Sequence, residues 1–294
     1  MSNYTAVDLT KLPVPDVVEA LDFETIFAAL LADFQSRDSA YDALLESDPA
    51  YKVLEAAAFR ELLIRQRVNE ACRAVMLAYA SESDLDQIGG NYDVERLLIT
   101  PGDPEAVPPV EPVYESDTDF RRRIQLSLEG KSTAGPEGAY KYHGLSADAD
   151  VKDVDVYSPA PGVVTVTVLS RTANGVPPQA TLDAVEASLT AKDVRPLTDQ
   201  VTVQAATIVN YTVDADLHLF DGPEAEIVRQ AAIAAVNAHV AERHMMGLDV
   251  SRSGIYSALH VEGVEKVILT APASDQAITN IQAAYCSSVT VVVA

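Results

Sequence analysis

Residues 115–136 constrain the local fold more tightly than any other part of this sequence. Ser116 precedes Asp119 by three residues, which is the spacing of a capping box: the serine oxygen accepts a free backbone N–H, and the carboxylate favours the positive end of the helix dipole. A helix is therefore predicted to start there. Gly130 predicts its end, and the Gly135-Pro136 pair predicts the start of the next helix.

The first of these helices is predicted to have one apolar face. Phe120, Ile124 and Leu128 recur at every fourth residue and form an apolar stripe. The three arginines at 121–123 project to other faces, where they are available to bind carboxylates. The segment therefore indicates capping and scaffolding rather than catalysis.

Two more helices are predicted earlier in the chain. Asp22 is the expected N-cap of a short helix with apolar positions at i, i+3, i+4 and i+7. After a break at Asp48-Pro49, a second helix is expected to run for roughly 30 residues to Tyr79, without an internal Gly or Pro. One face of it carries Leu54, Ala58, Leu62, Arg65, Val68, Cys72, Val75 and Tyr79. A helix of this length in a modest domain usually belongs to a bundle, often one completed by another chain, although packing within the chain is the alternative.

The short helix carries the predicted bundle interface. Its stripe contains three of the six phenylalanines of the chain, so it needs an apolar partner surface. We expect it to pack on the long helix and on helices of other subunits. The stripe consists of Phe23, Ile26, Phe27, Leu30, Leu31 and Phe34.

A proline-rich acidic linker is predicted at residues 101–115. Pro101, Pro104, Pro108, Pro109 and Pro112 disfavour a helix and favour an extended, polyproline-like connector. Residues 81–120 contain eleven Asp or Glu against one Arg. This acidic stretch is either a solvated face or a contact for a basic partner.

The apolar spacing changes to alternation after Val151, which predicts two small α+β modules and, with the helical N-terminal region, an α+β fold class. The first module has a hairpin around residues 158–162, a helix after Pro177-Pro178 and a strand at 201–205. The second has a strand at 211–219, a turn and helix start at Asp221-Gly-Pro223, a helix to about His239, a short helix and closing strands. The expected division is 1–100 (helical, bundle-forming), 101–115 (linker), 116–209 (helices and first α+β domain) and 210–294 (C-terminal α+β domain).

Composition excludes several functions. A formal charge of −23 argues against nucleic-acid binding, because phosphates attract Lys and Arg. No segment has the apolar length of a membrane span and no signal peptide begins the chain, so we expect a soluble protein made in a cytoplasm. Cys72 and Cys286 lack metal-site spacing and are expected to be buried thiols.

The catalytic and metal motifs that we considered each fail at a specific position. Residues 129–133 resemble the end of a phosphate-binding loop, but Gln125 stands where its first glycine belongs. His239 and His244 are five apart and face different sides of a helix, which does not suit a zinc site. Asp84 and Asp86 begin a calcium-loop pattern that Ile88 breaks, so Asp84 is instead expected to cap a one-turn helix ended by Gly89-Gly90. We expect no enzyme activity, cofactor or metal.

The order of these signals, with residues 84–92, 151–162, 195–199 and 260–265, resembles the baseplate J-like protein family over nearly the whole chain. Its members are wedge subunits of contractile phage tails and of R-type tailocins (pyocins), contractile injection systems related to phage tails. The resemblance implies a structural protein assembled in the bacterial host cytoplasm and then located in the tail baseplate of a virion or released tailocin. Implied partners are a second copy of the chain, a smaller helical wedge protein, a lysozyme-like sheath initiator, and hub and spike proteins.

The resemblance also implies that C-terminal domains of neighbouring copies join wedges into a ring that controls sheath contraction. Candidate ring contacts in this sequence are Leu217, Phe220, Ile255 and Leu259. Two other function classes remain open on the sequence: a small-molecule enzyme carried by the α+β modules, and a soluble adaptor.

Overall fold

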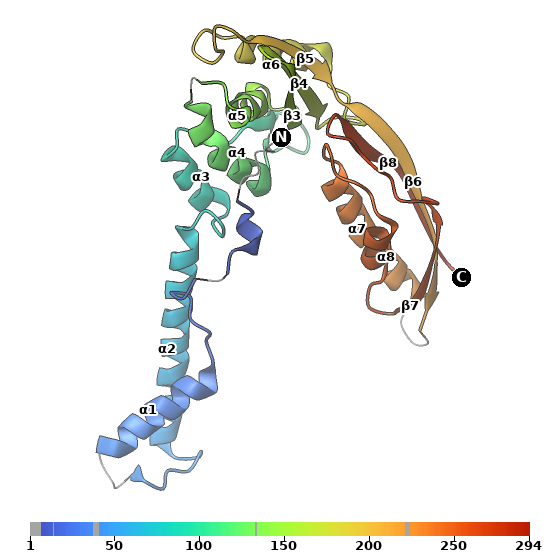
Figure 1. Cartoon of the computed structure of the whole chain (residues 1–294). Coiled ribbons are helices and arrows are strands. Elements are labelled where there is room, and N and C mark those ends of the chain that lie inside the picture. The colour runs from blue at the N-terminus through green and yellow to red at the C-terminus, as the bar shows by residue number, and fades with distance from the viewer. Residues whose placement is uncertain (1–6, 14, 38–40, 133, 221–223) are drawn as a thin grey trace. The chain divides into compact units, whose positions relative to one another are not determined.

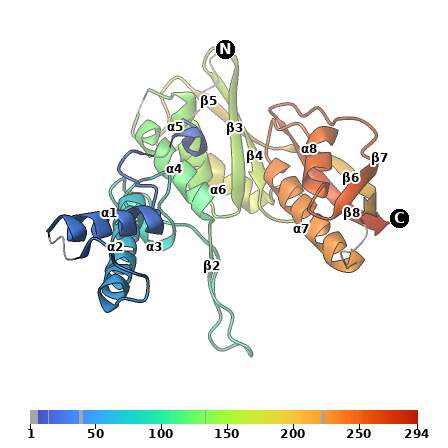
Figure 2. The same cartoon turned by 90° about the horizontal axis from the view of Figure 1, so that it is seen from below.

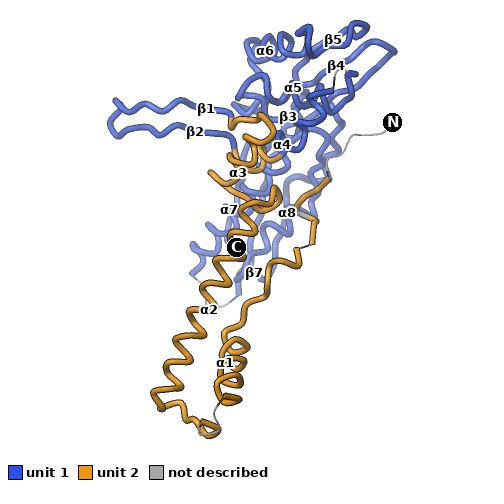
Figure 3. Tube along the Cα trace, turned by 90° about the vertical axis from the view of Figure 1, so that its left-hand side faces the viewer, with its two compact units in different colours: residues 1–4, 97–115, 122–294 blue, residues 5–96, 116–121 orange. Residues whose placement is uncertain are grey.

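The computed structural model of the chain describes residues 7–13, 15–37, 41–132, 134–220 and 224–294. The chain divides into two compact units, coloured separately in Figure 3. Unit 2 comprises residues 5–96 and 116–121, and unit 1 comprises residues 1–4, 97–115 and 122–294. The predicted turn at Asp221-Gly-Pro223 lies outside the described residues.

Unit 2 is helical, as predicted. The N-cap prediction for the short helix is confirmed, because the Asp22 carboxylate accepts a hydrogen bond from Thr25 N at 2.8 Å. This helix, α1, lies against the first turns of α2 (Figure 1). The helices of this unit are α1 (Phe23–Arg37), α2 (Pro49–Ala74), α3 (Glu82–Gly90) and the start of α4 (Asp117–Gly130), with a short 3-10 turn at Leu9–Lys11.

The long helix α2 ends earlier than predicted, at Ala74 rather than Tyr79. Beyond this end the chain turns, and a side chain distant in sequence holds the turns: Arg121 Nε donates to the carbonyl of Leu77 at 2.7 Å, and its Nη2 donates to the carbonyl of Ala80 at 2.6 Å. These carbonyls are therefore satisfied by a side chain, and the chain turns without continuing the helix.

Helix α3 is longer than the single turn expected, and its N-cap is Ser81 instead of Asp84. Its Gly89 serves packing more than termination. A Cβ on Gly89 would lie 2.4 Å from the ring of Phe120, which is fully buried. Glycine at this position therefore lets α3 and the start of α4 approach each other.

The serine part of the predicted capping box of α4 is confirmed: Asp119 N donates to Ser116 Oγ at 3.2 Å, and Asp119 lies in the first turn of the helix. The helix ends at Gly130, and α5 (Glu137–Ala147) follows Pro136, as predicted. The stripe prediction is right for Phe120 and Ile124, which are buried, and wrong for Leu128, which is exposed. Leu126 and Ser127 beside it are buried, so Leu128 is exposed because it lies on another face of the helix.

The first α+β domain has a three-stranded sheet in the order β3-β4-β5. Strands β3 (Val151–Ala160) and β4 (Val163–Ser170) form the predicted hairpin, with Val154 opposite Val168 and Val156 opposite Val166. Gly162 forms the turn with a φ of 76°, which favours glycine. Helix α6 (Gln179–Leu189) leads to β5 (Gln200–Ala205), which pairs parallel to β4. Valines of β3 and β4 pack against α5 and α6 to form the core.

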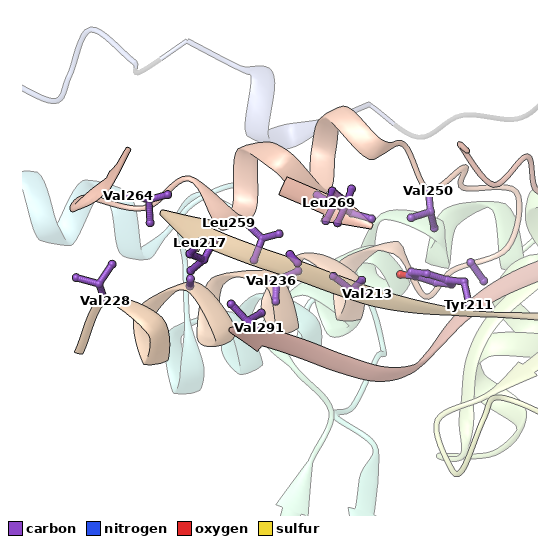
Figure 4. Close-up of a cluster of buried hydrophobic side chains, with 14 of the residues drawn as sticks. Tyr211, Val213, Leu217, Val228, Val236, Val250, Leu259, Val264, Leu269 and Val291 are labelled. Carbon is purple, nitrogen blue, oxygen red and sulfur yellow. The ribbon is translucent and has the colours of Figure 1, made fainter. Parts of the chain in front are cut away.

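The C-terminal domain repeats this plan with the strand order β7-β6-β8. The long strand β6 (Thr207–Leu219) pairs antiparallel with β7 (Val264–Ala271) and parallel with β8 (Gln282–Val293). Alternate residues of β6 point to α7 (Ala225–Arg243) and α8 (Arg252–Leu259), which cover one face of the sheet (Figure 4). The predicted α+β class is confirmed for both domains of unit 1.

The proline-rich segment does not run as the extended connector that we expected. It folds back as a hairpin in which β1 (Leu98–Thr100) pairs antiparallel with β2 (Val113–Tyr114). Asp103 and Val110 exchange two backbone hydrogen bonds further out, at 2.8 and 2.9 Å. Pairing between the two halves of the segment decided this fold, which the proline content alone does not predict.

In the C-terminal domain, substituting a buried side chain should reduce stability far more than substituting an exposed one. Leu217→Ala should cost about 2–5 kcal/mol in the free energy of unfolding of this domain, because the side chain is fully buried and the core cannot close the cavity. The matched control Phe220→Ala, at a side chain that is 56% exposed, should cost no more than about 0.5 kcal/mol. Urea titration followed by hydrogen exchange in β6 measures both, and equal losses would contradict the assignment of Leu217 to the core.

Acid should destabilise the same domain through His239. Burial lowers the pKa of His239, and Arg243 lowers it further; its Nε2 is buried without a hydrogen-bond partner among the described residues. Since the folded pKa lies below the unfolded value of about 6.5, the unfolded chain takes up the proton first as pH falls. Stability is thus complete above that value and declines below it.

His239→Gln removes the titrating group and should weaken this dependence. The measurement is the urea midpoint of the domain at about pH 7.5 and about pH 5.5, for the wild type and the variant. An identical pH response in both proteins would rule out His239 as a source.

Candidate interaction surfaces

The predicted bundle interface on α1 faces α2 of the same chain. Ile26 and Phe27 are buried against Ala58, and Phe27 contacts the Tyr51 ring edge-on with centroids 4.8 Å apart. Phe23, Leu30 and Leu31 are partly buried in the same cluster. Phe34 instead contacts Tyr41. The expected packing on the long helix is therefore observed, and this stripe is largely used within the chain.

Polar contacts hold the chain around Glu19, which precedes α1, along the same face of α2. Asn69 is buried and exchanges two hydrogen bonds with the backbone of Glu19, at 3.0 and 2.9 Å. Arg65 pairs with the carboxylates of Glu19 at 3.0 Å and Glu61 at 2.7 Å. The inner face of α2 is thus closed by α1 at one end and by the chain around Glu19 further along.

A second apolar face of α2 has no such cover. We call it the outer α2 face; it comprises Val53, Ala57, Ile64, Val68, Ala71 and the C-cap residue Val75. Val53 is 68% exposed, Ile64 65% and Val68 52%. Val53 and Ile64, and likewise Ala57 and Val68, are eleven residues apart, a spacing that returns to the same side of a straight helix after three turns.

This arrangement corrects the sequence prediction for α2. Val68 and Val75 were expected to share a face with Leu54, Ala58 and Leu62, but they lie on the outer face, where both are exposed. The prediction placed two separate apolar stripes on one face of the helix. The eleven-residue repeat was the signal that could have separated them.

Aromatic and ionic contacts fix the start of α4 within unit 2. The Arg96 guanidinium lies 4.7 Å from the ring centroid of Phe120 and pairs with Asp86 and Asp117, each at 2.8 Å. Although burial opposes ionisation, the Glu82 backbone N–H and Arg96 keep the pKa of Asp117 below its usual value. Asp86, which belonged to the incomplete calcium-loop pattern, therefore forms an ion pair with Arg96.

Arg122 and Arg123 bind carboxylates, as predicted for this helix. Arg123 pairs with Glu115, and both side chains are almost completely buried. Burial raises the pKa of Glu115, against the opposing effects of the Leu97 backbone N–H and the Arg123 charge. Arg122 Nη2 lies 2.7 Å from Asp153 Oδ1 on β3.

The four candidate ring contacts do not lie together on a surface. Leu217, Ile255 and Leu259 are fully buried in the C-terminal core, where Figure 4 shows Leu217 and Leu259 between the sheet and the helices. They have no surface to offer a neighbouring copy, so this part of the prediction is wrong. Phe220, just after β6, is 56% exposed.

The structure places the remaining motif residues in local contacts. His239 lies in α7, whereas His244 is past its end and its Nδ1 is 2.7 Å from the Ala284 carbonyl. No group of three or more His, Cys, Asp or Glu is arranged to hold a metal ion in the described ranges. Thr133 of the phosphate-loop-like motif lies outside those ranges. Among the helices of the described chain, none is long and apolar enough to cross a membrane.

The sequence matches three domain families of one protein type, in order. The Baseplate J-like N-terminal domain matches residues 46–103, the Baseplate J-like central domain matches 132–205, and the Baseplate J-like protein C-terminal domain matches 211–292. The central and C-terminal matches correspond closely to the two α+β domains of unit 1.

Two known proteins resemble the chain at different levels. Baseplate protein J of Escherichia phage P2 is 50% identical over 293 residues, which cover 97% of this chain and 97% of the phage protein. A chain in the cryo-EM structure of the anti-feeding prophage baseplate aligns with a TM-score of 0.40 and 13% identity, over 60% of this chain and 43% of that one. The second likeness is too weak to define a shared fold. The domain matches and the similarity to the phage P2 protein span nearly the whole sequence, and the chain belongs to the baseplate J-like family.

Proposed function

We propose that this chain is a wedge subunit of a contractile-tail baseplate, in a phage or a phage tail-like bacteriocin, and that its role is structural rather than enzymatic. Membership of the baseplate J-like family supports the baseplate role. The observation that carries the wedge assignment is the outer α2 face, a long apolar surface that the described chain leaves open. The protein assembles in the host cytoplasm and then resides in the tail baseplate.

The outer α2 face is suited to a helical partner. Its apolar positions follow the axis of one helix, and burying each Val or Ile there contributes about 1.5–3 kcal/mol. Exposed apolar patches of this extent mark interaction sites. We assign this face to a bundle with a second copy of the chain and a smaller helical wedge protein.

The C-terminal domain is the proposed joint between wedges. Phe220 is the member of the predicted ring set that is exposed, and Ile227 on α7 is also 64% exposed. Repeated contacts of this kind close a ring around the hub and spike when copies are related by rotation. A lysozyme-like sheath initiator is the further proposed partner, through which changes in wedge packing control sheath contraction.

Particle assembly tests the function directly. Deleting the gene for this chain should leave tails without assembled baseplates in negative-stain images, and supplying the intact chain from a plasmid should restore them. Purified particles should contain the chain by immunoblot. Normal, fully contractile particles from the deletion strain would refute the proposal.

Ile64→Asp should disrupt the bundle. The substitution puts a carboxylate in the middle of the outer α2 face, where burial in a complex would require desolvation of the charge. Copurification with the other wedge components should fall by at least about tenfold. Gln66→Asp, which adds the same charge at an exposed polar position of the same helix, is the matched control and should assemble normally.

Phe220→Asp should leave wedges intact but prevent ring closure. The measurement is the proportion of closed rings among negative-stain particles of the variant. Val176→Asp is the control, because Val176 is an exposed apolar residue of the other α+β domain, 46% accessible. Closed rings at the wild-type proportion in the Phe220 variant would exclude this residue from the joint.

A further inference from the structure

We propose that the hairpin at residues 97–115, which we call the arm, inserts into an apolar groove bordered by Lys and Arg on a different protein of the same assembly. This inference rests on the proposed baseplate function. The arm extends away from the other strands and helices of unit 1 (Figures 2 and 3). Nothing in the family matches assigns it a partner.

The arm is a built element with a fixed base. Glu115 N donates to Leu97 O at 2.9 Å, and Leu97 N donates to Glu115 Oε1 at 2.9 Å. The Glu115 carboxylate is also paired with the buried Arg123. Further out, a Cβ on Gly102 would lie 2.8 Å from the carbonyl of Val110, so the two limbs of the hairpin run in close contact. These contacts hold the arm in one shape before any partner binds.

Exposed apolar side chains line the arm. Val107 at its tip is 99% exposed, and four more residues behind it are 43–52% exposed. These four are Leu98, Val110, Val113 and Tyr114. Apolar side chains held in contact with water have a free-energy cost, which burial in a partner removes.

The arm is acidic, which favours a partner with a basic surface. Asp103, Glu105 and Glu111 are exposed, and no Lys, Arg or His occurs between residues 97 and 115. This charge opposes binding to phosphate groups of nucleic acids or anionic lipids. The whole chain is strongly acidic, at −23, so a basic surface that fits the arm is more readily supplied by another protein than by a second copy. The complementary surface is a basic one on another protein.

The prolines of the arm disfavour binding by strand addition. Five prolines in residues 101–112 lack backbone N–H groups and interrupt both edges of the hairpin. The arm therefore offers a poor template for an added strand. Recognition through side chains, with Val107 leading into an apolar groove, fits the geometry better than strand addition.

Photo-cross-linking in assembled particles tests this inference. Benzoylphenylalanine replaces Val107 in the full chain, purified particles are irradiated, and the adduct is mapped by mass spectrometry. We expect one adduct with a different particle protein, at a peptide that contains or adjoins Lys or Arg. The double substitution Glu105→Lys with Glu111→Lys should lower the adduct yield at least about tenfold. Asp193→Lys, at an exposed acidic residue of the central domain, should leave the yield unchanged.

A charge exchange completes the test. Changing the mapped basic residue of the partner to Glu should restore the adduct with the Lys variant of the arm. Adducts with a second copy of the chain, with DNA or lipid, or with no protein would each overturn the inference. The proposed function fails separately: the wild-type chain would then be missing from purified particles, whatever the arm does.

Discussion

Pairing of arginine charge, buried at Arg123 and partly buried at Arg121 and Arg122, is the constraint around which this part of helix α4 is organised. Three consecutive arginines take three different partners, and Arg123, which is buried, must be paired because its guanidinium is removed from water. Arg121 takes backbone carbonyls beyond the end of α2, Arg122 takes Asp153, and Arg123 takes Glu115 at the base of the arm. Within unit 1, Arg122 and Arg123 thereby hold α4 to β3 and to the base of the arm, and within unit 2, Arg121 holds the turns that follow α2.

Apolar surface is distributed differently in the two units. In unit 1, the alternating residues of β6 and the valines of β3 and β4 are enclosed by their own helices. In unit 2, one face of α2 is covered by α1 and the chain near Glu19, and the outer α2 face is left exposed. A helix with a second, exposed apolar stripe is typical of helical bundles, which is why we propose a bundle at this face.

The negative net charge of the chain affects its association with other proteins more than its folding. At −23, copies repel one another at long range, so contacts between them require apolar surface to offset that repulsion. The same charge raises the rate at which basic partners are encountered and strengthens selection among them. The exposed apolar residues of α2 and of the arm thus lie in a context that favours defined partners over indiscriminate association.

Local signals in the sequence determined where several helices begin and where the main strands of the α+β domains lie. The Asp22 cap, the Ser116 capping box, the hairpin at Gly162 and the alternation along β6 depend on neighbouring residues, and each is found where its pattern predicts. Only tertiary structure decided which apolar residues are covered. It buried Leu217, Ile255 and Leu259, exposed Val68 and Val75, and folded a proline-rich segment into an arm. The reason is physical: burial and pairing depend on contacts between residues distant in sequence, which a periodic pattern does not encode.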